Sequence, residues 1–347
     1  MKVVLYYNRF SSKLVANVIE FLKSYGIDYN VTYSKISENE LKDYDLIIVL
    51  GEDRDVLTVS HFMKNVSVPI LGISVSGSNV FLMESSVTEI EMVVEKVSMG
   101  EYHVVEVSRI DVSINGQPSE SVPCALNEVA IFPTKSATLM EHTLIVDGEF
   151  IWRDYSDGVI VATPTGSTAY SLSAGGPILL PTSKTFVIVS VNSLDLTRRP
   201  LVVSEQSKIE VKEISSRCDC EVIIDGSKRF KLDEEVHMTR AEKPALFVKL
   251  SREPEMTKRM AKKVLLAREL MDMPPSAKLI LKTLEYEGPL TQKDIIAKTL
   301  LPPRTVRHAL SLLLNKGLVQ KQPLLRDARQ DLYYVSMKFR TVSQAIA

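Results

Sequence analysis

The chain has 347 residues, of which 45% are apolar and 24% charged. It is therefore long enough for two or three domains with their own cores, and too apolar to be disordered. The formal net charge of −1 excludes a chain that is basic throughout. Three cysteines and five scattered histidines form neither a disulfide framework nor a metal-ligand pattern. There is no signal-peptide pattern and no run of about 18 apolar residues, so we expect a cytoplasmic protein without a membrane partner.

The first hundred residues alternate between apolar strands and an amphipathic helix. Residues 2–7, 45–50 and 69–73 are short apolar runs typical of buried strands. Residues 12–25 between the first two runs place apolar side chains at helical spacing. This order predicts an α/β domain with a parallel sheet over residues 1–100, and a ligand crevice at the carboxyl ends of its strands.

The periodicity changes to two at about Tyr102. Alternating segments, from YHVVEVSRIDVSI to ALFVKL, are separated by turn residues. They predict an all-β domain over residues 101–252, built as a sandwich. Pro254 follows the last strand, and the basic segment 255–272 reads as a helix. We assign that helix to a linker over residues 253–275; it could equally mediate dimerisation or contact DNA.

A segment rich in glycine and hydroxyl groups follows one of these strands. It reads TPTGSTAYSLSAGGP, from Thr163 to Pro177. Small residues let a ligand approach the backbone, while hydroxyls and exposed amides can bind phosphate, ribose hydroxyls or base edges. The same residues form good turns, so a tight loop without a ligand is the alternative interpretation.

Four further motifs accompany this run in a fixed order. They are Asn127-Glu128, Asp157-Gly158, Arg199-Pro200-Leu201 and Asp225-Gly226. Together with the run, they resemble the NAD kinase family over roughly residues 1–250. Members of that family use ATP or polyphosphate to phosphorylate the 2′-hydroxyl of NAD. The resemblance implies an α/β domain followed by an all-β domain, assembled as a homodimer or homotetramer with a nucleotide site near the subunit interface.

The resemblance also assigns roles to individual residues. Asn127 and Glu128 would hold ribose hydroxyls, because an amide and a carboxylate can both accept from a diol. NAD(H), NADP(H) or a related adenine nucleotide is the expected ligand. The residues expected to line its pocket are Asp157, Thr163, Ser167, Thr168, Ala169, Tyr170 and Ser173.

One family motif is altered in this chain. The family has Gly-Gly-Asp-Gly after a strand, where the Asp accepts the proton of the attacking hydroxyl and the glycines bring backbone N–H groups to the donor's phosphates. Here the segment reads Gly51-Glu52-Asp53-Arg54. Asp53 remains as a candidate general base. Glu52 adds a negative charge near the phosphates, and a Cβ atom where a positive φ would be strained.

The C-terminal segment is basic, with twelve Lys and Arg residues against five Asp and Glu from Ser276 onward. Its pattern predicts three helices and a hairpin. The first helix is expected to turn Leu279, Ile280 and Leu284 inward, and the third begins at Pro303. Three helices plus a two-stranded wing over residues 276–340 resemble archaeal and bacterial winged helix-turn-helix transcription regulators.

Such a module would bind double-stranded DNA through its third helix and its wing. The third helix would enter the major groove, and the wing would contact the backbone or minor groove. The residues expected to contact DNA are Arg304, Thr305, Arg307 and His308 on the helix, and Arg326 and Arg329 on the wing. The excess positive charge favours DNA, whereas a winged helix used for protein contacts is the alternative.

Two functions are compatible with these observations. In the first, an NAD-kinase-like sensor with a degenerate phosphoryl-donor loop binds a nucleotide and controls a DNA-binding module, which would make the protein a ligand-responsive transcription regulator. In the second, the protein is an active NAD kinase that uses ATP or polyphosphate with Mg²⁺, and Asp53 is its catalytic base. The altered Gly51-Glu52-Asp53-Arg54 loop favours the first function.

Overall fold

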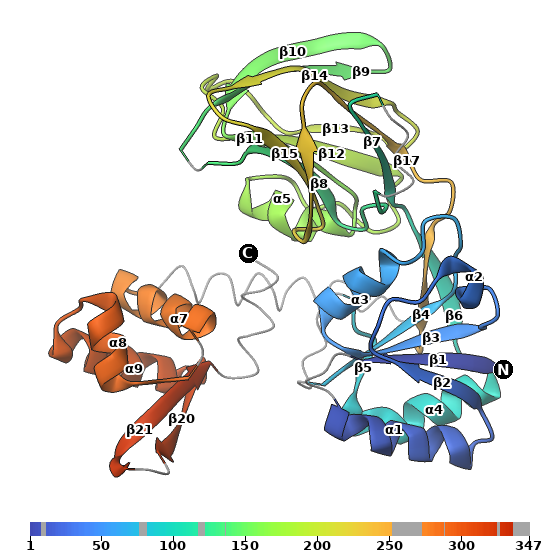
Figure 1. Cartoon of the computed structure of the whole chain (residues 1–347), viewed down its shortest axis with the longest axis vertical. Coiled ribbons are helices and arrows are strands. Elements are labelled where there is room, and N and C mark those ends of the chain that lie inside the picture. Colours follow the sequence, from blue (N-terminus) through green and yellow to red (C-terminus); the bar gives the residue numbers. More distant parts are fainter. Residues whose placement is uncertain are drawn as a thin grey trace.

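The computed structural model describes residues 1–7, 12–75, 82–116, 122–135, 137–251, 273–287, 289–324 and 327–335. The helix expected over residues 255–272 therefore lies outside the described residues. Figure 1 shows an α/β domain, a β-sandwich and a smaller helical module along the chain. Within the described ranges, no helix is both long and apolar enough to cross a membrane.

The α/β domain is built on a seven-stranded sheet with the order β2-β1-β3-β4-β18-β6, in which β5 also pairs with β4. Strands β1 to β4 are parallel, and β1 lies between β2 and β3. The chain order therefore reverses beside β3, which is where open α/β sheets usually bind ligands. The strands are β1 (Lys2–Tyr7), β2 (Asp28–Thr32), β3 (Leu46–Gly51), β4 (Ile70–Ser74), β5 (Ser85–Ser86), β6 (His103–Val107) and β18 (Ala245–Lys249).

Helices cover both faces of this sheet (Figure 1). Helices α1 (Ser12–Ser24) and α4 (Ile90–Met99), the latter preceded by the 3-10 turn η2 (Val87–Glu89), pack on one face. Helices α2 (Glu38–Leu41) and α3 (Asp53–Ser60) pack on the other. Every residue of β3 and β4 is consequently buried, as continuous apolar strands require. The predicted α/β layer and its parallel sheet are confirmed.

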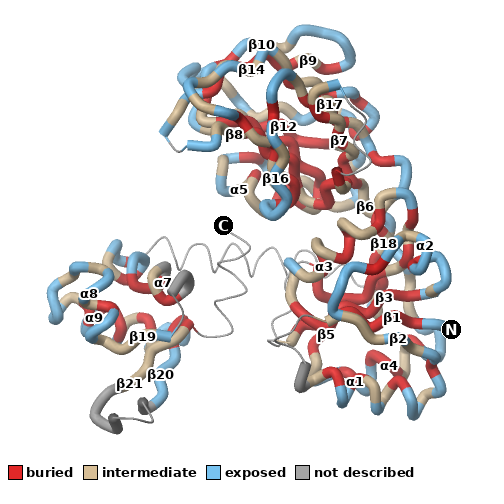
Figure 2. The backbone as a smooth tube through the Cα atoms, in the orientation of Figure 1, coloured by how far each residue is buried: buried red, intermediate tan, exposed pale blue. Residues whose placement is uncertain are grey.

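The sandwich is made of a five-stranded and a six-stranded sheet, with the orders β10-β9-β14-β17-β7 and β13-β12-β11-β8-β15-β16. Their inner faces share one hydrophobic core, which Figure 2 shows as the buried layer between them. The strands are β7 (Ile110–Ile114), β8 (Glu128–Pro133), β9 (Met140–Val146), β10 (Glu149–Ser156), β11 (Gly158–Ala162), β12 (Thr185–Val191), β13 (Leu201–Ser204), β14 (Ile209–Ser216), β15 (Cys220–Ile224), β16 (Lys228–Leu232) and β17 (Val236–Arg240). A short turn, η3 (Gly166–Thr168), and α5 (Tyr170–Ser173) connect β11 to β12.

Two strands do not belong to the sheet that the sequence predicts. The alternation after Tyr102 places every strand of residues 101–252 in the sandwich, but β6 and β18 pair with each other and complete the first sheet through β4. Alternation tells which side chains share a face of a strand, and it does not tell which sheet the strand joins. The sandwich is therefore inserted between two strands of the α/β domain.

A buried arginine also ties these two domains together. Arg109, which lies between β6 and β7, is the largest fully buried side chain, and its guanidinium donates to the carbonyls of Met63, Lys64 and Lys243. Burial lowers the pKa of Arg109, and nearby acidic groups oppose this effect. Each carbonyl would lose its partner if the guanidinium were removed, so this contact fixes the start of the sandwich against the segment that follows α3.

The helical module has a core of its own. Its helices are α7 (Pro275–Glu287), α8 (Gln292–Thr299) and α9 (Pro303–Asn315), and its sheet has the order β19-β21-β20, formed by β19 (Leu290–Thr291), β20 (Val319–Leu324) and β21 (Asp327–Val335). Thr291 and Asp294 form the expected capping box at the start of α8. The prediction for Leu279 is wrong, since this side chain is 45% exposed. The buried face of α7 instead carries Ala277, Ile280, Leu281 and Leu284.

A histidine lies in the interior of the sandwich. His142 of β9 is fully buried and pairs across the ladder with Asp154 of β10. Burial lowers the pKa of His142, and this effect outweighs the opposing influence of the Asp154 carboxylate. A neutral imidazole in the folded state means that protonation favours the unfolded chain.

We expect His142→Phe to reduce the loss of stability at acid pH. Below about pH 6.5 an unfolded histidine takes up a proton that the buried one resists, so the wild-type free energy of unfolding falls as the pH drops from 7 to 5. The phenylalanine variant cannot take up this proton. Urea unfolding at both pH values, followed through the fluorescence of Trp152 in the adjacent β10, measures the difference. The partly exposed His103→Gln serves as the control, and an unchanged pH dependence in His142→Phe would contradict the expectation.

Candidate functional site

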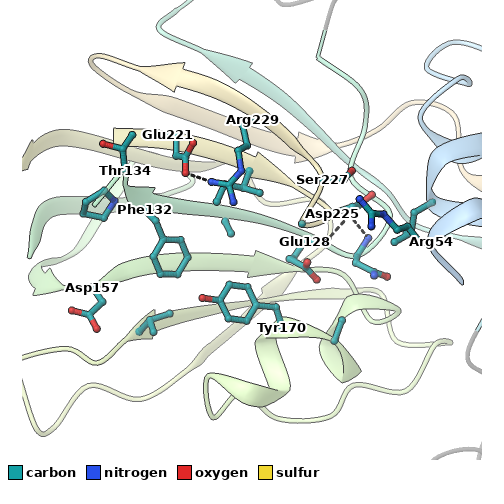
Figure 3. Close-up of a pocket in the computed structure, with 18 of the residues that line it drawn as sticks. Arg54, Glu128, Phe132, Thr134, Asp157, Tyr170, Glu221, Asp225, Ser227 and Arg229 are labelled. Carbon is teal, nitrogen blue, oxygen red and sulfur yellow. Dashed lines mark hydrogen bonds and ion pairs between the residues drawn. The ribbon is translucent and has the colours of Figure 1, made fainter. Parts of the chain in front are cut away.

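A cavity of about 930 Å³ lies between the carboxyl end of β3 and the six-stranded sheet of the sandwich. Figure 3 shows its walls, with Arg54 on the side of the α/β domain and Tyr170 and Phe132 on the side of the sandwich. Both domains therefore supply side chains to one pocket. The lining residues include Glu52, Asp53, Arg54, Leu82, Asn127, Glu128, Phe132, Lys135, Asp157, Thr168, Ala169, Tyr170, Asn192, Glu221, Asp225 and Arg229.

The buried carboxylate of Asp225 organises one wall. Its Oδ1 accepts the backbone N–H groups of Asn127 at 2.7 Å and Glu128 at 3.1 Å, and its Oδ2 accepts that of Leu126 at 3.0 Å. Oδ2 also lies 2.8 Å from Nε2 of His61, the residue that ends α3. One carboxylate thus fixes the turn that carries Asn127 and Glu128, and connects it to the helix that begins at Asp53.

The turn after β11 supports the same residues from the other side. Thr163 donates its hydroxyl to the carbonyl of Leu126 at 2.6 Å and its N–H to that of Asn127 at 2.9 Å. A Cβ atom on Gly166 would lie only 2.0 Å from the carbonyl oxygen of Asn127. Glycine is therefore required at this position because the two backbone segments are in direct contact.

Some of the predicted site residues line the cavity and others do not. The candidate base and six of the nine predicted nucleotide-binding residues line it: Asp53, Asn127, Glu128, Asp157, Thr168, Ala169 and Tyr170. Thr163 and Ser167 are buried instead, and Ser167 holds the turn through the carbonyl of Pro164 and the N–H of Leu179. Ser173 is exposed on α5 and does not line the cavity. The hydroxyls of Thr163 and Ser167 thus hold the turn beside the cavity and do not line it.

An aromatic pair forms part of the sandwich wall (Figure 3). The rings of Phe132 and Tyr170 stack with centroids 5.7 Å apart and an interplanar angle of 20°. Burial raises the pKa of Tyr170, and the carboxylates of Glu128 and Asp157 raise it further. The phenol therefore stays neutral near pH 7 and can donate a hydrogen bond, while the rings offer an apolar surface to a planar group.

The loop after β3 connects the strand directly to helix α3. Glu52 has φ −131° and ψ 176°, an extended conformation that any residue adopts, so the strain expected at this position is absent. Asp53 begins α3 and lines the cavity, and its Oδ1 accepts the N–H of Leu82 at 3.0 Å. A carboxylate oriented by a backbone amide is thus presented at the carboxyl end of β3.

Sequence reasoning missed the roles of His61, Asp225 and Arg109. The Asp225-Gly226 motif alone does not show that the Asp225 carboxylate accepts hydrogen bonds from the backbone N–H groups of three successive residues. His61 is 164 residues from its partner, so no local pattern could have revealed the contact.

Comparison with known proteins shows which family this chain is similar to. The family profile described as ATP-NAD kinase N-terminal domain matches residues 9–102, and that described as ATP-NAD kinase C-terminal domain matches residues 126–250. Among curated proteins, the NAD kinase of Methanopyrus kandleri is 35% identical over 62% of this chain and 77% of its own length. That of Thermococcus gammatolerans is 35% identical over 70% of this chain and 90% of its own length. The chain belongs to the NAD kinase family.

Solved structures of related kinases are also similar to this chain. The crystal structure of an NAD kinase from Archaeoglobus fulgidus in complex with ATP has 29% sequence identity and a TM-score of 0.65, and the match covers 76% of this chain and 98% of that one. The yeast NADH kinase complexed with NADH shares the fold, with a TM-score of 0.66 at 23% identity. Both family profiles end before the helical module.

The function expected first, a transcription regulator with a degenerate donor loop, is wrong. The curated relatives from several archaea and from the bacterium Bacteroides fragilis are NAD kinases, and so is the Archaeoglobus structure. That expectation assumes that the conformation of the loop requires the two glycines that Glu52 and Arg54 replace. The backbone at Glu52 shows that glycine is not needed for the observed conformation.

We expect Gly166→Ala to destabilise the sandwich by about 3 kcal/mol, because the added methyl group cannot fit beside the Asn127 carbonyl. Gly175→Ala is the matched control in the same segment. Gly175 has φ +87° and open space around it, so alanine there adds backbone strain of only about 1 kcal/mol. Urea unfolding followed by Trp152 fluorescence distinguishes the two, and equal losses would refute the close-contact argument.

Proposed function

We propose that this protein is an active NAD kinase, which transfers a phosphoryl group from ATP or polyphosphate to the 2′-hydroxyl of NAD. The observation that carries this proposal is the placement of Asp53 and the Asn127-Glu128 turn on opposite walls of one cavity. The family relatives named NAD kinase support the choice of reaction. Their names also support NAD and ATP as the substrates to test first.

The sandwich wall suits a dinucleotide. Asn127 and Glu128 would bind ribose hydroxyls, and their turn is held rigid by Asp225. The Phe132 and Tyr170 rings would contact a planar base. Asp157 would accept a further hydrogen bond from the ligand, with its carboxylate oriented by the side-chain amide of Asn192 at 2.8 Å.

Asp53 would act as the general base. As the oxygen of the 2′-hydroxyl forms a bond to the terminal phosphorus of ATP, the carboxylate accepts the hydroxyl proton, and the bond from that phosphorus to the ADP oxygen breaks. The products are NADP and ADP. The described residues offer no group of three His, Cys, Asp or Glu side chains arranged to hold a metal ion. A Mg²⁺ ion would therefore enter with the phosphates, whose oxygens are its preferred ligands.

Asp53→Asn is expected to lower the rate of NADP formation by at least about 100-fold, because the amide cannot accept the proton. Binding of NAD, measured by calorimetry, should remain because the sandwich wall is unchanged. Asp43→Asn, at an exposed site of the same domain, is the control. Normal turnover by Asp53→Asn would place the base elsewhere, and a wild-type protein inactive with both donors would refute the proposed function.

The expected homodimer or homotetramer remains part of this proposal. Exposed apolar side chains support it, since Phe150, Leu194 and Leu196 of the sandwich are 67%, 64% and 88% exposed. Light scattering behind size exclusion is expected to give at least twice the monomer mass of 38.8 kDa. A single species at the monomer mass would contradict this part of the proposal.

We also propose that residues 273–335 form a winged helix-turn-helix module, appended to the kinase, that binds double-stranded DNA. Arg304, Arg307 and His308 are exposed on α9 and Thr305 is partly exposed, while the opposite face of the helix packs into the core of the module. Arg329 lies in β21, and Arg326 lies outside the described residues. The excess of positive charge in this segment supports a polyanionic partner.

Replacing both Arg304 and Arg307 by alanine should weaken binding to duplex DNA by about 10-fold at 0.1 M salt and reduce its salt dependence, because two phosphate contacts are lost. Fluorescence anisotropy with a labelled duplex over a salt series measures both effects. Lys23→Ala, on the exposed face of α1, removes a positive charge elsewhere and is the control. Unchanged binding by the double variant would exclude α9 as the contact surface.

A further inference from the structure

The cavity contains more carboxylates than cationic groups. Among the residues that the structure describes, its acidic lining residues are Glu52, Asp53, Glu128, Asp157, Glu221 and Asp225, and its basic ones are Arg54, Lys135 and Arg229. A phosphate chain brings several further negative charges into this environment. Such a ligand needs direct contact with a cation, because like charges at short range repel strongly in a partly buried site.

Two of the three cations are poorly placed for this task near Asp53. Arg229 of β16 forms an ion pair with Glu221 of the neighbouring β15, as Figure 3 shows. Lys135 follows the end of β8, seven residues beyond Glu128. An extended strand of that length spans about 20 Å, so Lys135 lies toward the opposite end of the pocket from the Asn127-Glu128 turn.

Arg54 is placed differently. It directly follows Asp53 in the first turn of α3, is exposed, and lines the cavity. Its guanidinium forms no ion pair with any described residue, and the bond from Thr58 reaches only its backbone carbonyl. In Figure 3 its side chain extends from the α/β domain toward the sandwich wall. A guanidinium with five N–H donors is thus available beside the candidate base.

Two backbone amides of the loop are engaged within the loop itself. The N–H of Glu52 donates to the carboxylate of Asp55 at 2.8 Å, and the N–H of Asp55 donates to the carbonyl of Glu52 at 2.8 Å. These two amides are therefore directed into the turn. A phosphate group that approaches Asp53 cannot use these two amides, and Arg54 is the cation adjacent to Asp53 in the chain.

We propose that Arg54 binds the phosphate chain of the phosphoryl donor, ATP or polyphosphate. This assignment rests on the proposed kinase function for the identity of the donor. The planar guanidinium contacts two phosphate oxygens at once, offsets the negative charges of Glu52 and Asp53, and holds the terminal phosphorus near the Asp53 carboxylate. Arg54 thereby determines affinity for the donor, whereas the sandwich wall determines affinity for NAD.

The test compares Arg54→Ala and Arg54→Lys with the wild-type full-length chain. Calorimetric titrations with Mg²⁺–ATP, tripolyphosphate and NAD measure each affinity separately, and steady-state kinetics give KM for ATP and for NAD. Arg54→Ala is expected to weaken ATP and tripolyphosphate binding by about 10- to 100-fold, with the affinity for NAD changed by less than about 2-fold. Arg54→Lys should recover part of the affinity, because it keeps the charge and loses the planar fork.

Arg217→Ala is the matched control. Arg217 is an exposed arginine in the bend between β14 and β15, and it is not among the residues that line the cavity. Its replacement removes the same charge from the same protein, so equal losses of ATP affinity in Arg217→Ala and Arg54→Ala would overturn a specific contact. A loss confined to NAD in Arg54→Ala, or no loss for any ligand, would also overturn the assignment.

The binding measurements separate this inference from the proposed function. If the wild-type protein binds ATP through Arg54 but forms no NADP, the kinase proposal fails and the Arg54 contact stands. If the protein forms NADP and Arg54→Ala does so with an unchanged KM for ATP, the Arg54 assignment fails and the kinase proposal stands.

Discussion

The carboxylate of Asp225 holds the pocket together. It accepts the amides of three successive residues and contacts His61 of the α/β domain, so the turn with Asn127 and Glu128 is fixed in both position and direction. The backbone carbonyls of this turn accept the hydrogen bonds of Thr163, and they lie too close to position 166 for any side chain there. Without the carboxylate, three buried or partly buried N–H groups would lack an acceptor, a cost of about 1–3 kcal/mol for each group.

The altered loop places both a carboxylate and a guanidinium beside Asp53 without a strained backbone. Glu52 occupies an extended conformation, and the first turn of α3 follows it directly. The chain therefore keeps a carboxylate at the reversal point of the sheet, where β3 ends, while Arg54 adds a cation beside it. In an enzyme whose reaction depends mainly on positioning and charge neutralisation, a side-chain cation and a backbone amide can serve the same electrostatic purpose.

Much of the fold could be predicted because its signals are local. The apolar spacing of α1, the buried runs of β1, β3 and β4, and the cap of α8 by Thr291 depend on neighbouring residues alone. The sheet membership of β6 and β18, and the contact of His61 with Asp225, depend on segments far apart in the chain. The sequence also does not show that the hydroxyls of Thr163 and Ser167 hold the turn, since a hydroxyl that binds a ligand and one that holds a turn look alike in sequence. Whether the backbone at Glu52 is strained depends on its φ angle, which the residue type alone does not determine.

The insertion of the sandwich between β6 and β18 has a mechanical consequence. The chain leaves the first sheet at Val107 and returns to it at Ala245, and these two residues are paired with each other. The two domains are thus connected by two chain crossings that lie side by side. Arg109 lies two residues beyond Val107, and its contacts with Met63, Lys64 and Lys243 reinforce the connection at the same place. The contact of Asp225 with His61 joins the same two domains beside the pocket, so the position of the Asn127-Glu128 turn relative to Asp53 depends on this contact as well as on the double crossing.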